Sequence, residues 1–271
     1  MDKIEILKEY FGYSSLKPEQ ERIIDTIFAG KDAIGLLPTG YGKSLTYQIP
    51  ALIFDGLTIV ISPLISLMQD QVIELKERFI KAEYINSLQD SYEIDSVYRQ
   101  IDRGNVKILY VSAERLLTKR FIEMAMKTEI SLIVVDEAHT LLWSEDFRFA
   151  LGRINEFIKL LKNRPPILAV TATATNNTVD KIKKLLELKS PTLVIGDMDR
   201  KNIFYNMIVT KDKDGDLIKI LTGYKEKCII YCLTIKACLH VRELLKKINI
   251  RAMIYHGKLS GSEKKATLED F

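Results

Sequence analysis

The feature that most constrains this chain is a glycine-bearing turn between an apolar run and a helix-like segment. Residues 37–44 read Leu-Pro-Thr-Gly-Tyr-Gly-Lys-Ser. A strand, such a turn and a helix beginning at Lys-Ser form a phosphate cradle, because backbone N–H groups converge there at the positive end of the helix dipole. Lys43 can reach the β- and γ-phosphates, and the Ser44 hydroxyl can ligate Mg²⁺. The strict pattern has Gly at Leu37, so an ordinary strand-to-helix turn is the alternative.

Composition indicates a globular protein and limits its surroundings. The 271 residues are 47% hydrophobic, which suits one large or two ordinary domains, and the net charge of +4 permits a polyanionic partner. No window approaches the roughly 18 apolar residues of a membrane span, and the N-terminus lacks an apolar signal core. We therefore expect a cytoplasmic protein without membrane contact. Cys228, Cys232 and Cys238 lack zinc-site spacing, so we expect buried apolar roles and no zinc.

Strand and helix signals alternate over most of the chain. This alternation predicts an α/β fold, a parallel sheet with helices on both faces. The predicted strands are 32–37, 57–62, 107–111, 132–136, 167–171 and 192–195. The predicted helices are 2–11, 18–29, 65–78, 93–103, 115–127, 151–161 and 178–186.

A second unit is predicted to begin near residue 201. Its predicted strands are 203–209, 227–231 and 251–255, with a charged turn at 211–216 and helices at 235–248 and 262–271. We expect one domain over residues 1–200 and a partial domain over residues 201–271. Since about 70 residues are few for a doubly wound domain, we interpret the chain as a fragment or a truncated reading frame.

Two adjacent acids follow the predicted strand at 132–136. Residues 131–139 read Ser-Leu-Ile-Val-Val-Asp-Glu-Ala-His. The first carboxylate, Asp136, is expected at the carboxyl edge of the sheet beside the phosphate turn, where it can hold Mg²⁺ through water. Glu137 can then orient and polarise an attacking water. Two acids after a strand often mark only a solvated loop, but the phosphate turn upstream favours the catalytic interpretation.

The two segments together resemble those of superfamily 2 helicases, which are built from two RecA-like lobes. More narrowly, the chain is similar to RecQ-family DNA helicases over essentially its whole length. The resemblance implies a RecA-like P-loop NTPase lobe, a partial second lobe, and ATP and Mg²⁺ as cofactors. The catalytic residues it implies are Lys43, Asp136, Glu137 and His139, with Ser44 and Asp136 at the metal, the latter through water. The ATP-binding residues it implies are Tyr13, Lys17, Gln20, Pro38, Thr39, Gly40, Tyr41, Gly42, Lys43 and Ser44.

The segment before the phosphate turn resembles the adenine-reading motif of this family. Tyr13 and Lys17 would lie against the base, and the Gln20 amide would read its donor and acceptor edge. The family usually has Arg at Lys17, and lysine lacks the planar guanidinium, so stacking should be weaker. Without this context, Gln20 would be an ordinary surface helix residue.

A further segment, residues 62–72, resembles one that touches the phosphates of single-stranded DNA in the relatives. Ser62 and Pro63 would position a strand without reading its sequence; alone, they read as a helix start. Thr171 and Thr173 resemble the motif that couples the nucleotide site to lobe movement. As β-branched residues at a strand end they also need no function.

The aromatic segment 143–148 resembles the RecQ loop that senses single-stranded DNA. Trp143 and Phe147 could stack on unpaired bases while Arg148 supplies charge, although plain core aromatics are the alternative. The spacing from His139 to Trp143 is one residue shorter than in the family, and Phe149 replaces a proline. These departures imply altered coupling to ATP hydrolysis.

The resemblance implies an ATP-dependent helicase that translocates 3′ to 5′ on single-stranded and junction DNA and acts in DNA repair and recombination. The arginine finger of the family matches no segment here, so we expect a monomeric nucleotide- and DNA-binding chain with weak turnover and little or no unwinding. An RNA helicase and a non-catalytic DNA- or ATP-binding interaction protein are the alternatives. A metabolic P-loop kinase would not explain the further helicase-like segments.

Overall fold

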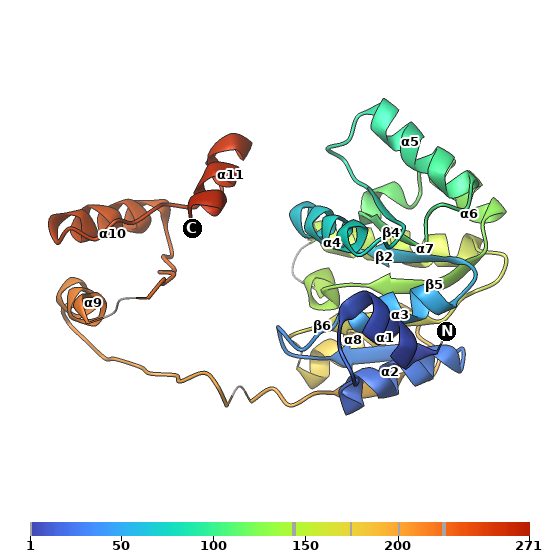
Figure 1. Ribbon diagram of the computed structural model, residues 1–271, viewed down its shortest axis with the longest axis horizontal. Helices are drawn as coiled ribbons and strands as arrows, with labels where there is room; N and C mark the ends of the chain where they lie inside the picture. The colour runs from blue at the N-terminus through green and yellow to red at the C-terminus, as the bar shows by residue number, and fades with distance from the viewer. Residues whose placement is uncertain (1, 143–144, 174, 200, 224–225) are drawn as a thin grey trace. The chain divides into compact units, whose positions relative to one another are not determined.

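The computed structural model describes residues 2–142, 145–173, 175–199, 201–223 and 226–271 (Figure 1). The chain divides into two compact units, Met1–Arg200 and Lys201–Phe271. The first unit contains the sheet, and the described part of the second is helices and irregular segments. Among the described residues, no helix is both long and apolar enough to cross a bilayer.

The first unit is built on a seven-stranded parallel sheet of order β3-β4-β2-β5-β6-β1-β7. Its strands are β1 Ala33–Leu36, β2 Leu57–Ile61, β3 Ala82–Ile85, β4 Ile108–Val111, β5 Ile130–Val135, β6 Ile167–Thr171 and β7 Thr192–Ile195. The predicted parallel α/β fold is confirmed. The edge strand β3 was not predicted, because its residues Ala-Glu-Tyr-Ile are only partly buried and form no continuous apolar run.

Helices cover both faces of this sheet (Figure 1). They are α1 Lys3–Phe11, α2 Pro18–Phe28, α3 Leu45–Ile53, α4 Ile65–Glu77, α5 Ser91–Asp102, α6 Lys119–Lys127, α7 Glu145–Leu160 and α8 Asn176–Leu185, with short 3₁₀ turns η1 Ala113–Arg115 and η2 Ala138–Leu142. Helices α1 to α4 pack on one face, around Val60 and Val134. Helices α5 to α8 pack on the other, around Ile59 and Ile133. Two buried faces explain why the central strands are near-continuous apolar runs, interrupted only by small residues such as Thr58.

Local signals set the ends of the first helices. The Asp2 side chain accepts from the N–H groups of Ile4 and Glu5, and the Glu5 carboxylate accepts from the Asp2 N–H, a reciprocal capping box. Gly12 ends α1 in the left-handed region at φ 74°. Pro18 opens α2, where its missing N–H costs no helical hydrogen bond.

A buried carboxylate ties together the amino ends of three neighbouring strands. Asp32, just before β1, accepts two hydrogen bonds from the Arg164 guanidinium at 2.9 and 2.7 Å. It also accepts from the Ile167 N–H, where β6 begins, and from the Lys189 N–H, before β7. Only 2% of Asp32 is exposed, so these four bonds replace its hydration. The contact holds the sheet at the edge opposite the phosphate turn.

We predict that Asp32→Ala lowers the free energy of unfolding by about 3–5 kcal/mol, because it leaves a guanidinium and two N–H groups without their acceptor. Urea denaturation would measure the loss. The control is Asp180→Ala, which breaks an exposed pair with Lys183 and should cost less than about 1 kcal/mol. Equal, small losses in both variants would contradict this role of Asp32.

The second unit contains helices α9 Lys213–Thr222, α10 Ile235–Lys247 and α11 Gly261–Asp270, and its described residues form no strand. The predicted strands at 203–209, 227–231 and 251–255 are therefore wrong. Strands need hydrogen-bonded neighbours, and here apolar side chains such as Phe204 and Tyr231 are 88% and 91% exposed. The predicted charged turn at 211–216 is largely the first turn of α9, which Asp212 caps.

The cysteine prediction is also corrected. Cys228 is exposed, and Cys232 and Cys238 are partly buried. In the part of this segment that the structure describes, the residues around Cys228 form no strand, so this apolar run stays exposed and is not buried in a sheet.

Candidate active site

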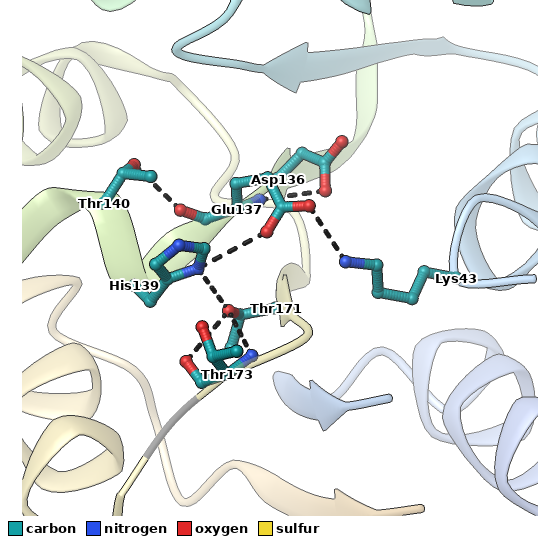
Figure 2. Close-up of polar contacts among 7 residues, drawn as sticks. All are labelled: Lys43, Asp136, Glu137, His139, Thr140, Thr171 and Thr173. Atoms are coloured by element: carbon teal, nitrogen blue, oxygen red, sulfur yellow. Dashed lines mark hydrogen bonds and ion pairs between the residues drawn. The ribbon is translucent and has the colours of Figure 1, made fainter. Parts of the chain in front are cut away.

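The candidate site lies where β1, β6 and β5 end. These strands are neighbours in the sheet, and parallel strands present their carboxyl ends at one edge. The phosphate turn follows β1, Asp136 and Glu137 follow β5, and Thr171 is the last residue of β6. Segments far apart in the sequence therefore meet at this edge (Figure 2).

The phosphate turn depends on its two glycines. Gly40 and Gly42 have φ of 76° and 78°, in the left-handed region that favours glycine. Within the turn, the Tyr41 N–H donates to the Pro38 carbonyl at 3.1 Å, and this hydrogen bond closes a turn whose two central residues are Thr39 and Gly40. A side chain at Gly42 would also meet the Gln20 amide at 2.6 Å. Helical hydrogen bonds begin with Leu45 N–H to the Gly42 carbonyl, so the turn leads directly into α3.

Gln20 holds this turn from α2. Its Nε2 donates to the carbonyls of Tyr41 at 2.8 Å and Gly42 at 3.1 Å, and its Oε1 accepts from the Lys17 N–H at 2.9 Å. A trans peptide places each C=O opposite the next N–H. The Gln20 contacts therefore turn the N–H groups of Gly42 and Lys43 away from α2. Gln20 is 3% exposed, not the surface residue that α2 alone suggests, and its amide engages the turn itself.

The lysine of the turn is paired with the second acid. Lys43 Nζ lies 2.9 Å from Glu137 Oε1, with the two side chains only 14% and 20% exposed (Figure 2). Glu137 has φ of 47°, a left-handed conformation that is uncommon for a residue with a side chain. Its carbonyl accepts from the N–H and hydroxyl of Thr140 at 2.9 and 2.8 Å. The chain bend after β5 thus aims the Glu137 carboxylate at Lys43.

His139 continues this contact toward β6. Its Nδ1 lies 3.3 Å from Glu137 Oε2 and 2.6 Å from the Thr171 hydroxyl. Thr171 in turn accepts from the Thr173 N–H at 3.3 Å. Burial lowers the pKa of His139, the Glu137 charge opposes this and Lys43 adds to it, so the neutral imidazole is favoured. A continuous polar chain thereby joins Lys43 to Thr173 (Figure 2).

Asp136 is the more buried of the two acids. It is 8% exposed, and its Oδ1 accepts from the Glu137 N–H at 2.9 Å. Burial raises its pKa from 3.8 to about 6, and the Glu137 charge acts in the same direction. The Glu137 N–H and Lys43 lower it by less. Among the described residues, no group of three or more His, Cys, Asp or Glu could enclose a metal.

Two buried tyrosines beside this site were not singled out from the sequence. The hydroxyls of Tyr47 on α3 and Tyr110 on β4 lie 3.5 Å apart, and the two residues are 0% and 1% exposed. Burial raises the pKa of both, and the Asp136 charge adds to this effect. A polar residue such as Tyr47 inside the apolar start of α3 was the available signal.

The residues expected to meet DNA are only partly described. Ser62 and Pro63 follow β2, the neighbour of β5, at the same sheet edge; the buried Ser62 hydroxyl has no hydrogen-bond partner among the described residues. Trp143 lies outside the described residues. Residues 145–148 belong to α7, so the predicted loop is wrong there. The sequence Glu145-Asp146 places two acids where a helix begins, a position at which acids complement the helix dipole and favour a helix. The side chains of Phe147 and Arg148 are likewise outside the description.

The two residues expected to lie against the base are exposed. Tyr13, just after α1, is 57% exposed, and Lys17 directly precedes α2. Both are thus accessible, and Lys17 also contacts Tyr41 of the turn.

Comparison with known proteins agrees with this geometry. A family model described as DEAD/DEAH box helicase matches residues 17–182. The chain is 38% identical over 270 residues to the ATP-dependent DNA helicase RecQ of Pasteurella multocida, covering 99% of this chain and 43% of that protein. It is 37% identical over 269 residues to the RecQ of Bacillus subtilis, covering 98% and 46%.

A third relative is named as a putative ATP-dependent RNA helicase, R290 of Acanthamoeba polyphaga mimivirus. It is 37% identical over 274 residues, with 98% of this chain and 49% of that protein covered. The chain thus spans about half the length of these curated relatives.

The fold also matches a solved helicase. The crystal structure of the DUF1998 helicase MrfA bound to DNA aligns with a TM-score of 0.74 at 18% identity, covering 91% of this chain and 39% of that one. At this identity the likeness concerns the fold, a RecA-like helicase architecture. Because the family match spans the phosphate turn, the Asp-Glu-Ala-His segment and Thr171, which the fold gathers at one edge, the chain belongs to the DEAD/DEAH box helicase family.

Proposed function

We propose that this chain is of the RecQ type of ATP-dependent DNA helicase, in which ATP hydrolysis drives 3′ to 5′ movement on single-stranded DNA. By itself the chain would bind ATP and DNA, with weak turnover and little or no unwinding. The observation that supports the proposal most directly is the contact of Lys43 with Glu137, at the sheet edge where the phosphate turn follows β1. Similarity to two proteins named RecQ supports the choice of DNA. In this proposal residues 1–200 are the ATP-binding lobe and residues 201–271 belong to the second.

Triphosphate binding would begin with an exchange of partners at Lys43. In this structure its ammonium neutralises the Glu137 carboxylate at 2.9 Å. The N–H groups of Gly42 and Lys43, turned away from Gln20, offer donors for phosphate oxygens at the start of α3. A triphosphate held there competes for Lys43 and releases Glu137. The freed carboxylate can then orient the attacking water.

The acid Asp136 and the Ser44 hydroxyl fit a magnesium ion. Both are hard oxygen donors, and Mg²⁺ is usually held by one or two protein oxygens together with substrate phosphates and waters, so no enclosing cluster is needed. When bound, the ion would neutralise charge developing on the transferred phosphoryl group. It would also offset the burial of the Asp136 charge.

The chain from Glu137 through His139 to Thr171 is proposed to report the state of the site. When Glu137 is released from Lys43, its negative charge is no longer neutralised by the ammonium. His139 Nδ1, which contacts both Glu137 and Thr171, then faces an unneutralised carboxylate. Thr171 is also hydrogen-bonded to Thr173. A change at the nucleotide can therefore reach the segment after β6 through this series of polar contacts.

A DNA strand is proposed to cross the same sheet edge. Ser62 and Pro63 would contact its phosphates, and Trp143, Phe147 and Arg148 its bases and charge. The aromatic segment directly follows η2, which contains His139. A base stacked on this segment would therefore contact residues only a few positions after the acids. RNA is the second candidate because one relative is named as a putative RNA helicase.

Substitution of the turn lysine tests this proposal. We predict that Lys43→Ala weakens binding of Mg²⁺ with a non-hydrolysable ATP analogue by at least about tenfold, or about 1.4 kcal/mol, because the phosphates lose their cation. Calorimetry would measure the affinity, with Lys31→Ala, an exposed lysine before β1, as the control. Competition between single-stranded DNA and RNA of one sequence would choose the nucleic acid. Equal affinity of wild type and Lys43→Ala would refute the proposed site.

The buried Asp136 gives a pH test. Because its pKa is raised to about 6 in the folded protein, the folded state binds more protons than the unfolded state, and stability falls as the pH rises through about 6. Asp136→Asn removes this ionisation and keeps an acceptor for the Glu137 N–H. We predict that it raises the free energy of unfolding by about 2–3 kcal/mol at pH 8, and less at pH 5.

This comparison is made by urea denaturation with a chelator and no nucleotide. Asp70→Asn, at an exposed position on α4, is the matched control and should change stability little at either pH. A variant at Asp136 that is no more stable than wild type at pH 8 would show that the buried charge carries no such cost.

A further inference from the structure

We infer that Tyr41 and Glu19 determine nucleobase affinity at this site, by closing a clasp over Lys17 and Gln20 that a bound base has to open. The clasp is defined as these four residues: Lys17, Glu19, Gln20 and Tyr41. The inference rests on the proposed function and on the expectation, from the sequence resemblance, that Lys17 and Gln20 contact the base. It adds two residues to which no base contact has been assigned.

Tyr41 makes four contacts with the segment at the start of α2. The Lys17 ammonium lies 3.9 Å from the centre of the Tyr41 ring, and 3.5 Å from the Tyr41 carbonyl oxygen. The Tyr41 hydroxyl donates to Glu19 Oε2. The Tyr41 carbonyl accepts from Gln20 Nε2 at 2.8 Å. One residue of the phosphate turn thus contacts both Lys17 and Gln20, the residues that the sequence resemblance places against the base.

The phosphate site does not require this side chain. Backbone N–H groups of the turn and Lys43 supply the donors for phosphate, and the flanking glycines supply the unusual backbone angles. A tyrosine at this position therefore contributes through its ring and hydroxyl to something other than phosphate binding. The ring contacts Lys17 and the hydroxyl contacts Glu19, and Lys17 is one of the two residues expected to contact the base.

A base that uses the Gln20 amide has to displace contacts already made. Both Nε2 hydrogens are engaged, by Tyr41 and Gly42, and Oε1 accepts from the Lys17 N–H. An acceptor on the base therefore takes a hydrogen from a turn carbonyl. Movement of Lys17 onto the base likewise weakens its cation–π contact with Tyr41. The clasp should lower the affinity for a nucleotide without lowering the affinity for its phosphates.

Glu19 has a matched control in the same helix turn. Glu19 and Glu21 both lie in the first turn of α2, where acids are favourable whatever else they contact. Glu21 pairs with Lys3 at 2.9 Å, whereas Glu19 accepts from the Tyr41 hydroxyl. A comparison of the two removes the general effect of a first-turn acid.

The test compares two probes, each with Mg²⁺: a non-hydrolysable ATP analogue and inorganic tripolyphosphate. Calorimetry on the full chain gives the ratio of their affinities. We expect this ratio to rise roughly three- to tenfold in Tyr41→Leu, which removes the ring and the hydroxyl, and about two- to threefold in Glu19→Gln. In Glu21→Gln it should stay at the wild-type value.

An unchanged ratio in Tyr41→Leu and Glu19→Gln would overturn the clasp, and a lower ratio in Tyr41→Leu would make Tyr41 a stacking partner of the base instead. If Tyr41→Leu fails to fold by circular dichroism, Glu19→Gln against Glu21→Gln decides. Wild type that binds neither probe would refute the proposed function itself, which is a distinct result.

Discussion

The parallel register of β5, β6 and β1 is the constraint on which the rest of this structure depends. Ala169 of β6 pairs with Val135 on one side and with Ile34 on the other. This register brings the ends of three strands to one level, so the loops that follow them begin side by side. The Lys43–Glu137 pair, 94 residues apart in the chain, forms only because the register places both loops at one edge. At the opposite ends of the strands, Asp32 secures β1 and β6, together with β7.

Within the part of the chain that the structure describes, only Glu137 of the two acids at this site is paired with a positive charge within ion-pair distance. Lys43 and Glu137 neutralise each other, and the arrangement of β5 leaves Asp136 buried with a raised pKa. A site of this kind costs stability when empty and recovers it when a cation and a polyanion bind, which is a common feature of sites adapted to ligand binding. The strained φ of Glu137 fits the same interpretation, since it directs the carboxylate toward the place where phosphate would compete for Lys43.

The sequence predicted those parts of the fold that local patterns determine. The strands at 167–171 and 192–195 were predicted with their observed bounds, because both are short apolar runs between clear breaks. Strand β3 was not predicted, because an edge strand needs few apolar residues and so gives a weak sequence signal. The strands of the second unit were wrong because apolar runs become strands only with a paired neighbour, a condition that the sequence of one segment does not contain.

The site was predictable in its chemistry more than in its contacts. The residue types of the phosphate turn and of the acids indicate phosphate and metal chemistry at once. The pairing of Lys43 with Glu137, and of Tyr41 with Lys17 and Glu19, arises only when separate elements meet. Burial of Gln20 was likewise invisible, because a polar residue in an amphipathic helix looks exposed until the turn packs against it.

The central claim is that Lys43 exchanges Glu137 for a triphosphate at this sheet edge. The most direct measurement is a crystal structure of the chain with Mg²⁺ and a non-hydrolysable ATP analogue. We expect Lys43 Nζ to contact phosphate oxygens, Glu137 to be released, and the metal to lie beside Asp136 and Ser44. A nucleotide bound elsewhere, with Lys43 and Glu137 still paired, would contradict it.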